Sequence, residues 1–520
     1  MNLKITTLVR LNNQTNLIMS QKIIKLFILS LIVLTSCSKE DATDTTSISI
    51  EEAQRTPLTP QQINAKISEE LNTKGVFNWN TASSHLLWSA VVNGNNVVSI
   101  GFGNSKSNFE RAKTSNNAKI QSELLSIITK YEATTLDKIV IMSDSDLNLV
   151  DVVLNNQETI IALRQSKYIR YLEPADYSYL NDRNVENRSS GSGSGCGYEA
   201  TTLAAADYTT ITPNAKVPWT FYQHNIPSAW NVSTGSGITI GIIDTGISPN
   251  QSLLGSNFNN GLSSGRTIQK NGVYVDSIWP WSTTTDGVND LCGHGTSMAS
   301  VAAAPRNNKG LPVGVAYNAN LVTYRAASNV VLDGYQEQEA VKKAFTALAN
   351  NSNVKIISMS MGHIFSVGKI EDAVKLAYGK GKLIFCAAGT STSFTTFVGI
   401  IFPAWMPETI AVTGVKEGAI YQACDNCHTG SKVEFTVAMQ RAATGNTVPV
   451  DSYYENQTDY VGGSSVATAT TAGIAALIWS KNPTWTRAQV LSKMRQSASF
   501  FPNKNSAYGY GNINAFLAVQ

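Results

Sequence analysis

Ser465 is the residue of this sequence whose surroundings first suggest chemistry. It lies in V-G-G-S-S-V-A-T-A-T-T-A-G-I-A-A-L-I-W (461–479), whose small and apolar residues predict a helix that is buried on most sides. At the start of such a helix, a serine hydroxyl faces unpaired N–H groups and the positive end of the helix dipole, which stabilise a nearby negative oxygen. The alternative is an ordinary N-cap serine before a core helix.

A base and an orienting acid for Ser465 are present elsewhere in the chain. Asp244 ends the β-branched run I-T-I-G-I-I-D-T-G-I, and His294 lies in the glycine-flanked L-C-G-H-G-T. A histidine can take the proton of a serine hydroxyl as that hydroxyl attacks a carbonyl, and a carboxylate can hold the imidazole in the correct tautomer. The three residues lie far apart in the sequence, so only a folded domain can bring them together.

These blocks resemble those of the subtilase (subtilisin-like) family of serine endopeptidases. Three carry its catalytic residues in the order Asp, His, Ser: D-T-G-I, G-H-G-T and G-S-S-V-A, the last in place of the family's G-T-S-M-A. Four further segments are similar to family motifs: G-V-A-Y-N-A-N-L from Gly314, S-M-S-M-G from Ser358, P-E-T-I-A-V-T-G-V from Pro407, and the closing Y-G-Y-G-N-I-N-A. The resemblance covers about residues 215–520.

The resemblance implies a serine endopeptidase in which Asp244, His294 and Ser465 form the catalytic triad. It also implies that Ser360, Met361 and Gly362 pair with the backbone of a polypeptide substrate as an edge strand. Such chemistry requires no cofactor and no metal. Loops in this family often bind calcium, and Asp286 and Asp290 are candidates by residue type, but no ligand spacing in this sequence supports a calcium site.

Thr390 departs from the family pattern. The segment F-C-A-A-G-T stands where the family has A-A-G-N, whose asparagine donates a hydrogen bond to the oxyanion. In subtilisin the loss of that donor lowers turnover by about 10²–10³. Thr390 is the candidate replacement, with a hydroxyl whose reach is shorter by about one bond than that of the asparagine amide. An alternative function is therefore a weakly active or inactive subtilase relative that binds peptides.

Strands and helices are expected to alternate within residues 215–520. Short apolar runs typical of buried parallel strands occur at 238–243, 321–325, 354–361, 383–388 and 409–415, and helical spacing of apolar residues lies between them. This predicts a doubly wound, mostly parallel α/β sheet, whose active site lies beyond the carboxyl ends of the strands. Asp244 and Gly389 both fall at such ends.

Residues 1–36 resemble the signal peptide of a bacterial lipoprotein. Lys22 and Lys25 precede the apolar run L-F-I-L-S-L-I-V-L, and Cys37 follows directly after Thr35-Ser36. The resemblance implies cleavage before Cys37 and its acylation, with the chain exported to the outer membrane or cell surface. The alternative is a plain signal peptide. Residues 37–74 are expected to be a flexible tether, because the chain to about Pro60 is rich in Thr, Ser, Asp and Glu.

Residues 75–180 are expected to form a small α+β, ferredoxin-like domain. A hairpin around Asn93-Gly94 with strands at 86–92 and 96–102, a helix over 120–131 and another over 157–165 are predicted from the pattern. Its closing Y-I-R-Y-L-E-P resembles the end of the propeptide that inhibits many subtilases. The alternative is an unrelated binding module of the same common fold. A Gly/Ser-rich linker follows at 181–214, and a cut in or near it would free the catalytic part.

The charge balance and the cysteines bear on three further properties: nucleic-acid binding, disulfide formation and haem attachment. With 40 basic and 37 acidic residues the net charge is only +3, which gives no reason to expect a nucleic-acid partner. Besides Cys37 there are five cysteines, whose pairing the sequence leaves open, although Cys424 and Cys427 in C-D-N-C could form a tight disulfide. With His428 that segment also matches the C-x-x-C-H haem-attachment pattern, so an electron carrier is a third reading.

Overall fold

The computed structural model of the chain describes residues 56–105, 109, 115–179, 196–198, 200–390 and 399–520. The expected signal peptide, Cys37 and most of the expected tether lie outside these residues. In the described part of the chain, no helix combines the length and the apolar character needed to cross a membrane.

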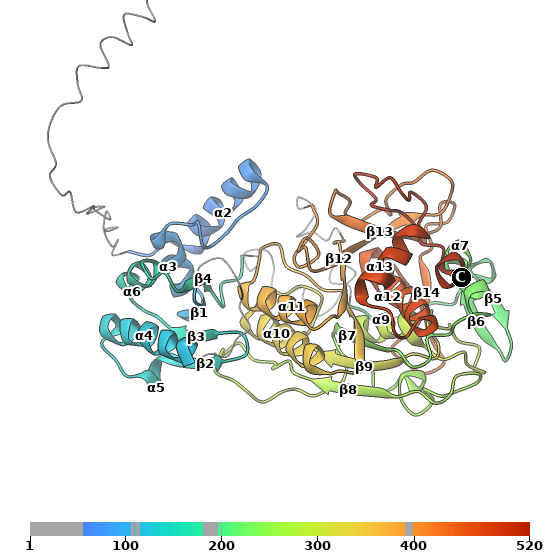
Figure 1. The fold of residues 1–520 in the computed structure, drawn as a ribbon, viewed down its shortest axis with the longest axis horizontal. Coiled ribbons are helices and arrows are strands. Elements are labelled where there is room, and N and C mark those ends of the chain that lie inside the picture. Colours follow the sequence, from blue (N-terminus) through green and yellow to red (C-terminus); the bar gives the residue numbers. More distant parts are fainter. Residues whose placement is uncertain (1–55, 106–108, 110–114, 180–195, 199, 391–398) are drawn as a thin grey trace, which may run out of the picture. The chain divides into compact units, whose positions relative to one another are not determined.

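A small domain occupies residues 57–179 (Figure 1). Its elements are α2 (Pro60–Lys74), α3 (Ser84–Val92), β1 (Val97–Phe102), α4 (Ser115–Glu132), α5 (Leu136–Ile139), β2 (Val140–Asp144), β3 (Leu149–Val153), α6 (Gln157–Arg164) and β4 (Ile169–Pro174). The strands form one antiparallel sheet in the order β2-β3-β1-β4. From β1 to β4 this is the β-α-β-β-α-β arrangement of ferredoxin-like domains.

Two predictions for this domain were wrong. The expected first strand of the hairpin is helix α3, because the Ser83 side chain accepts a hydrogen bond from the Leu86 N–H and starts a helix that is buried almost all round. The expected tether ends earlier than residue 74, because α2 begins at Pro60 behind a capping box formed by Thr59 and Gln62. Ile63 and Ile67 of α2 are fully buried in the core of the domain.

A parallel sheet of seven strands forms the centre of the second domain. Its strands are β7 (Thr239–Asp244), β8 (Ile268–Gly272), β9 (Asn320–Arg325), β10 (Val354–Met359), β11 (Leu383–Ala387), β12 (Ile410–Lys416) and β13 (Val433–Gln440). They lie in the order β13-β12-β11-β10-β7-β9-β8, and every pairing is parallel. The chain turns to opposite sides of β7 for β9 and β10, so the end of β7 lies at the switch point where such sheets bind ligands.

Helices cover both faces of this sheet. On one face lie α10 (Tyr335–Asn350) and α11 (Gly368–Gly379), which pack side by side (Figure 1). On the other lie α9 (His294–Ala303) and α12 (Gly463–Lys481), which also contact each other. Alternate residues of β7 enter the two cores: Ile240 and Ile242 pack on the α9/α12 side, and Ile243 packs on the α10/α11 side. The predicted doubly wound α/β fold is confirmed.

Helix α12 is buried on all sides, as its small residues predict. It contacts α9 and five strands of the sheet, and Val466 to Trp479 are buried without a break. Its small residues permit this close approach: a Cβ on Gly473 would lie 2.5 Å from the Val315 Cβ. The burial fixes the direction of α12, and with it the position of Ser465 in its first turn.

The remaining elements surround the sheet. They are β5 (Tyr208–Ile211), β6 (Ala215–Pro218), α7 (Trp219–Gln223), α8 (Ile226–Ala229), β14 (Val448–Asp451), β15 (Thr458–Val461), α13 (Arg487–Gln496) and α14 (Ala515–Val519). β5 and β6 form an antiparallel hairpin. The linker expected at 181–214 therefore extends too far, because Cys196, Gly197 and Thr201 already bond to the second domain.

Candidate active site

The Asp244–His294 pair lies where β7 ends and α9 begins. Asp244 is the last residue of β7, and His294 is the first residue of α9. Nδ1 of His294 lies 2.7 Å from Oδ1 of Asp244, and both side chains are buried. The Thr245 N–H donates to the same carboxylate oxygen at 2.8 Å. The carboxylate therefore orients the ring, with Nε2 on the side away from Asp244.

Glycines on both sides of His294 permit this arrangement. Gly293 has φ +91°, and a Cβ there would lie 2.3 Å from the carbonyl oxygen of Gly197. A Cβ on Gly295 would lie 2.4 Å from the carbonyl oxygen of Gly246, in the loop after Asp244. Both glycines of G-H-G are thus required by close backbone contacts: Gly293 lies against Gly197, and Gly295 lies against the loop that follows Asp244.

The electrostatics of His294 suit a general base. Burial of the ring acts to lower the pKa of His294, but the charge of Asp244, its hydrogen bond and the more distant Asp290 outweigh burial, so this pKa lies above its ordinary value. The imidazolium that forms when the ring accepts a proton is therefore stabilised. The ring is neutral, and able to accept that proton, only above this raised pKa.

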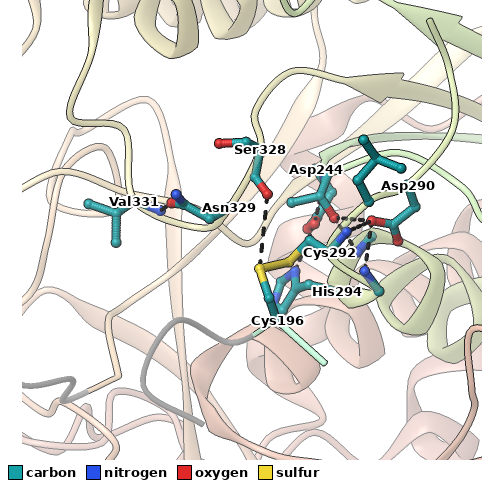
Figure 2. Close-up of a disulfide and its surroundings, with 12 residues drawn as sticks. Cys196, Asp244, Asp290, Cys292, His294, Ser328, Asn329 and Val331 are labelled. Atoms are coloured by element: carbon teal, nitrogen blue, oxygen red, sulfur yellow. Dashed lines mark hydrogen bonds and ion pairs between the residues drawn. A yellow bond between two sulfur atoms is a disulfide. The ribbon is translucent and has the colours of Figure 1, made fainter. Parts of the chain in front are cut away.

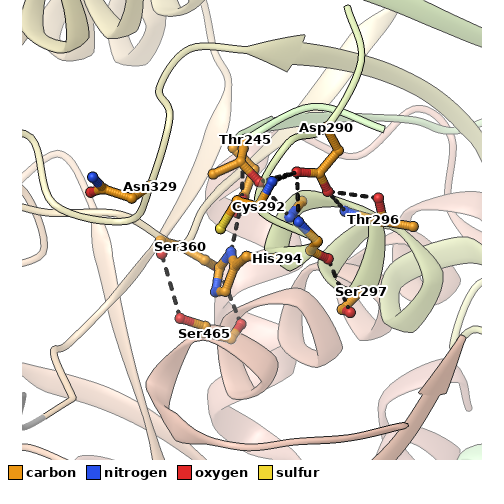
Figure 3. A network of polar contacts seen from close by, with 12 residues as sticks. Thr245, Asp290, Cys292, His294, Thr296, Ser297, Asn329, Ser360 and Ser465 are labelled. Atoms are coloured by element: carbon orange, nitrogen blue, oxygen red, sulfur yellow. Dashed lines mark hydrogen bonds and ion pairs between the residues drawn. The ribbon is translucent and has the colours of Figure 1, made fainter. Parts of the chain in front are cut away.

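Ser465 is the third residue of α12 and lies beside the same histidine. Figure 3 shows the His294 imidazole directed toward Ser465. The Ser465 hydroxyl donates to the carbonyl of Ser360 at 3.4 Å, and the Ser360 hydroxyl donates to the carbonyl of Ser465 at 3.1 Å. The structure thus brings Asp244, His294 and Ser465, which are distant in the sequence, into one site.

Asp290 organises the loop that carries His294. It is fully buried, and its Oδ1 accepts from the Cys292 and Gly293 N–H groups at 2.8 Å each and from Thr245 at 2.9 Å. Its Oδ2 accepts from the N–H and hydroxyl of Thr296 at 3.0 and 2.7 Å (Figure 3). Both carboxylate oxygens of Asp290 are therefore occupied by hydrogen bonds that hold the loop around His294. Sequence reasoning missed this role, although an acid four residues before a glycine-flanked histidine was the available signal.

The expected substrate-binding segment is already paired in this structure. Gly362 donates to the carbonyl of Val330 at 3.1 Å, and its own carbonyl accepts from the Leu332 N–H at 3.1 Å. Met361 is buried in the α10/α11 core rather than lying at the surface. Of the three residues, Ser360 contacts Ser465 directly, whereas the backbone groups of Gly362 are occupied by residues 330–332.

The Thr390 side chain contacts the first turn of α12. Its hydroxyl accepts from the Ser464 N–H at 3.0 Å and lies 3.0 Å from the Ser464 hydroxyl, which in turn accepts from the Gly389 N–H at 3.1 Å. Thr390 thus joins the end of the β11 loop to the first turn of α12. Ser464 was missed by sequence reasoning, because its role depends on this contact.

Four of the five cysteines in the described residues form two disulfides, and the fifth is a buried free thiol. Cys196 pairs with Cys292, and Cys424 pairs with Cys427, whereas Cys386 is free in the core. The haem reading was wrong, because both cysteines of C-D-N-C are joined to each other. Within the described residues, no group of three or more His, Cys, Asp or Glu side chains could hold a metal ion. Asp286 pairs with Arg325 at 2.5 Å.

Comparison with known proteins gives a consistent result. The profile of the subtilase family matches residues 235–511, more than half of the chain. M-protease of Shouchella clausii is 30% identical over 319 residues, which are 61% of this chain and 72% of that protein. Subtilisin E of Bacillus subtilis is 30% identical over 305 residues, which are 58% of this chain and 71% of that protein.

Solved structures share the fold. Fervidolysin from Fervidobacterium pennivorans, described as a keratinolytic enzyme related to subtilisin, aligns with a TM-score of 0.56 and 18% sequence identity. The alignment covers 82% of this chain but only 61% of the fervidolysin chain. At this identity the likeness concerns the fold alone.

Proposed function

The chain belongs to the subtilase family and is a serine endopeptidase, and from this premise we propose that Asp244, His294 and Ser465 are its catalytic triad. His294 accepts the proton of Ser465 through Nε2 as the Ser465 oxygen attacks a peptide carbonyl, and then gives it to the leaving amine. Asp244 holds the Nδ1–H tautomer and stabilises the imidazolium. Water then hydrolyses the acyl-enzyme by the same proton transfers in reverse.

The 2.7 Å contact between His294 Nδ1 and Asp244 Oδ1, beside a serine in the first turn of a buried helix, carries this proposal. A fluorophosphonate probe tests it, because such probes label only a serine that is activated as a nucleophile. Labelling mapped by mass spectrometry to Ser465 is expected. Labelling elsewhere, or none on a processed and folded chain, contradicts the assignment.

An active endopeptidase is favoured over a peptide-binding relative without turnover. The relatives that match include proteins named M-protease and alkaline protease, and the contact between Asp244 and His294 is intact. Thr390 is the main argument for weak activity. Because its hydroxyl already bonds within the first turn of α12, we propose that oxyanion stabilisation in this chain is incomplete.

Replacing Thr390 by asparagine should therefore raise turnover. An amide at this position adds a donor for the oxyanion, a contribution worth up to about 10²–10³ in kcat in subtilisin, and we expect a gain of about tenfold with KM unchanged. Steady-state kinetics on a fluorogenic peptide measure it, with Thr390→Ser as the conservative control. No gain, or a fall in kcat, for Thr390→Asn would contradict an incomplete oxyanion site.

We also propose that the small domain is an inhibitory propeptide. Helices α10 and α11 of the second domain lack side-chain caps of their own, with Gly334 and Val367 at their N-caps. Glu173 of the small domain accepts from the Gly368 N–H at 2.8 Å, and Asp176 accepts from the Tyr335 N–H at 3.1 Å. Side-chain oxygens that accept from the first N–H groups of a helix stabilise it, so the small domain completes two helices of the other domain.

Buried ion pairs add to this interface. Arg170 binds both oxygens of Asp372 at 2.7 and 2.6 Å, and both side chains are buried. Lys369 lies 2.7 Å from Asp151 of the small domain, where both are almost fully buried. Charges buried at an interface favour one precise partner, because each is costly when left unpaired. Within the catalytic domain itself, the hydrogen bonds of Gly362 to Val330 and Leu332 would have to open before a substrate could pair with Gly362.

Replacing Arg170 by alanine should release the small domain after cleavage. The change leaves the Asp372 carboxylate buried without its bidentate partner, at a cost of about 3–5 kcal/mol, or roughly 10² to 4 × 10³ in affinity. Gel filtration of the cleaved wild-type protein should show the two domains eluting together, and those of Arg170→Ala eluting separately. Lys74→Ala, which removes an exposed pair with Glu70, is the matched control. Co-elution in both variants would count against the interface.

Export as a lipoprotein anchored through Cys37 is the proposed location, supported by the sequence of residues 22–37. In that arrangement the lipid is attached to the propeptide side, and cleavage frees the catalytic domain unless the two stay bound. Metabolic labelling with a fatty acid, abolished in Cys37→Ser, tests the anchor.

A further inference from the structure

A strap of residues 196–198 and 200–207 crosses the outside of the loop that carries His294. Cys196 is bonded to Cys292, two positions before His294, although these cysteines are 96 positions apart in the sequence (Figure 2). The Gly197 N–H donates to the carbonyl of Cys292 at 2.8 Å, and the Tyr198 hydroxyl donates to the carbonyl of Leu291. Three consecutive residues of the strap therefore contact consecutive parts of the histidine loop.

The other end of the strap is attached to the strand that leads to Ser465. The Thr201 N–H donates to the carbonyl of Thr458 at 2.7 Å, and the Thr458 hydroxyl donates to the carbonyl of Thr201 at 2.9 Å. Asp207 accepts from the hydroxyl of Tyr460 at 2.6 Å. Because β15 runs directly into α12, the strap connects the loop of the proposed base with the segment of the proposed nucleophile.

The histidine loop is held from two sides. Asp290 binds the N–H groups of Cys292 and Gly293 from inside the domain, whereas the strap holds the carbonyl and the side chain of Cys292 from outside. The contact at Gly293 leaves no space, since a Cβ there would strike the Gly197 oxygen. Asp290 is buried and cannot be altered without moving the core, but Cys196 is only half-buried, so the outer attachment is open to thiol chemistry.

We propose that the Cys196–Cys292 disulfide positions the loop of His294 for catalysis, so that turnover by this chain depends on the redox state of this one bond. The inference rests on the proposed function of His294. Reduction by a dithiol breaks the sulfur–sulfur bond, transfers two electrons and two protons to give two cysteine thiols, and leaves the reductant as its cyclic disulfide. Only the covalent part of the outer restraint is lost, because the five hydrogen bonds of Asp290 and those of Gly197 and Tyr198 do not involve the sulfur atoms.

This placement also has a consequence for the processed enzyme. A cut between the two domains, upstream of Cys196, leaves the strap covalently joined to the histidine loop as the first part of the mature chain. The disulfide forms readily only in an oxidising compartment, so full turnover is reached after export rather than before it. The strap therefore acts as a positioning element that the mature enzyme retains, in contrast to the small domain.

The test uses processed wild-type protein separated from its small domain, which requires no variant to fold. Kinetics on a fluorogenic peptide are measured with oxidised protein, after dithiothreitol, and after reoxidation with oxidised glutathione. A displacement of about 1 Å at a catalytic group costs about 10² in rate, so we expect kcat to fall by roughly that factor on reduction, with KM within twofold, and to recover on reoxidation. Mass spectrometry after alkylation confirms which cysteines were reduced.

The double variant Cys196→Ser/Cys292→Ser provides the matched comparison. It should show the lowered kcat from the start and no further response to dithiothreitol, which also excludes the Cys424–Cys427 disulfide as the cause. Unchanged kcat with Cys196 and Cys292 alkylated overturns the proposal, as does a loss that coincides with unfolding by circular dichroism. If oxidised protein itself neither turns over nor labels at Ser465, it is the proposed function that fails, and the positioning role fails with it.

Discussion

Ser465→Ala should lose about 10⁶ in kcat, the loss measured for the nucleophile of subtilisin, while KM changes little. The substitution removes one oxygen from the first turn of a helix that is buried on every side, so neither the fold nor the peptide-binding surface changes. The remaining activity over water reflects binding and oxyanion donors alone. Assays on a fluorogenic peptide measure the effect. The variant must first be cleaved in trans by a removable, affinity-tagged wild-type enzyme and separated from its small domain, because a bound small domain would itself suppress activity.

Ser480→Ala is the control for this prediction. Ser480 lies in the last turn of the same helix, where its hydroxyl donates to the carbonyl of Ser236 at 2.7 Å near the surface. Its removal should leave kcat within about twofold, because surface substitutions away from special contacts change little. Comparable losses in both variants would mean that helix stability, rather than the Ser465 oxygen, is being measured.

Asp244→Asn should lower kcat by about 10⁴, because an amide stabilises the wrong tautomer of the imidazole and no longer offsets its positive charge. The geometry of the site should be kept, since the two side chains have nearly the same shape. Stopped assays with milligram amounts of processed enzyme, or a burst experiment with an activated ester, can detect the residual rate. A loss of less than tenfold would show that the 2.7 Å contact with His294 is not used in catalysis.

We also expect Asp244→Asn to change the pH dependence of kcat/KM. In the wild type, the pKa of His294 is raised above its ordinary value despite burial, because of Asp244, so activity is lost as the pH falls through this raised pKa. Without the carboxylate, burial dominates and lowers the pKa of His294. The acid limb of the kcat/KM profile of Asp244→Asn should therefore lie at lower pH than that of the wild type. A limb that stays in place, or moves to higher pH, contradicts this account of the electrostatics.

The central sheet and the site could be predicted because they depend on local signals. Buried parallel strands are continuous apolar runs, and the five that were expected correspond to β7, β9, β10, β11 and β12. The more polar edge strand β8 was not expected, and nor was β13. Asp244, His294 and Ser465 each stand at the end of a strand or the start of a helix, where the glycines mark the change of element.

Features that depend on tertiary contacts could not be read from the sequence. The segment 86–92 has the composition of a strand, and only the capping hydrogen bond at Ser83 and burial on all sides make it helix α3. The partner of Cys196 is 96 positions away, and no local pattern identifies it. The pairing of Gly362 with residues 330–332 and of Thr390 with Ser464 joins loops from different strands, so only the assembled sheet shows them.

Expression of residues 38–520 beside the same chain with Ser465→Ala, followed by intact mass and N-terminal sequencing, tests the central claim most directly. If Asp244, His294 and Ser465 form a working triad in a zymogen, the wild-type chain will lose its small domain and the Ser465→Ala chain will keep it. The new N-terminus will lie between the small domain and Cys196. Full-length protein in both, or the same cut in both, would contradict self-processing by Ser465.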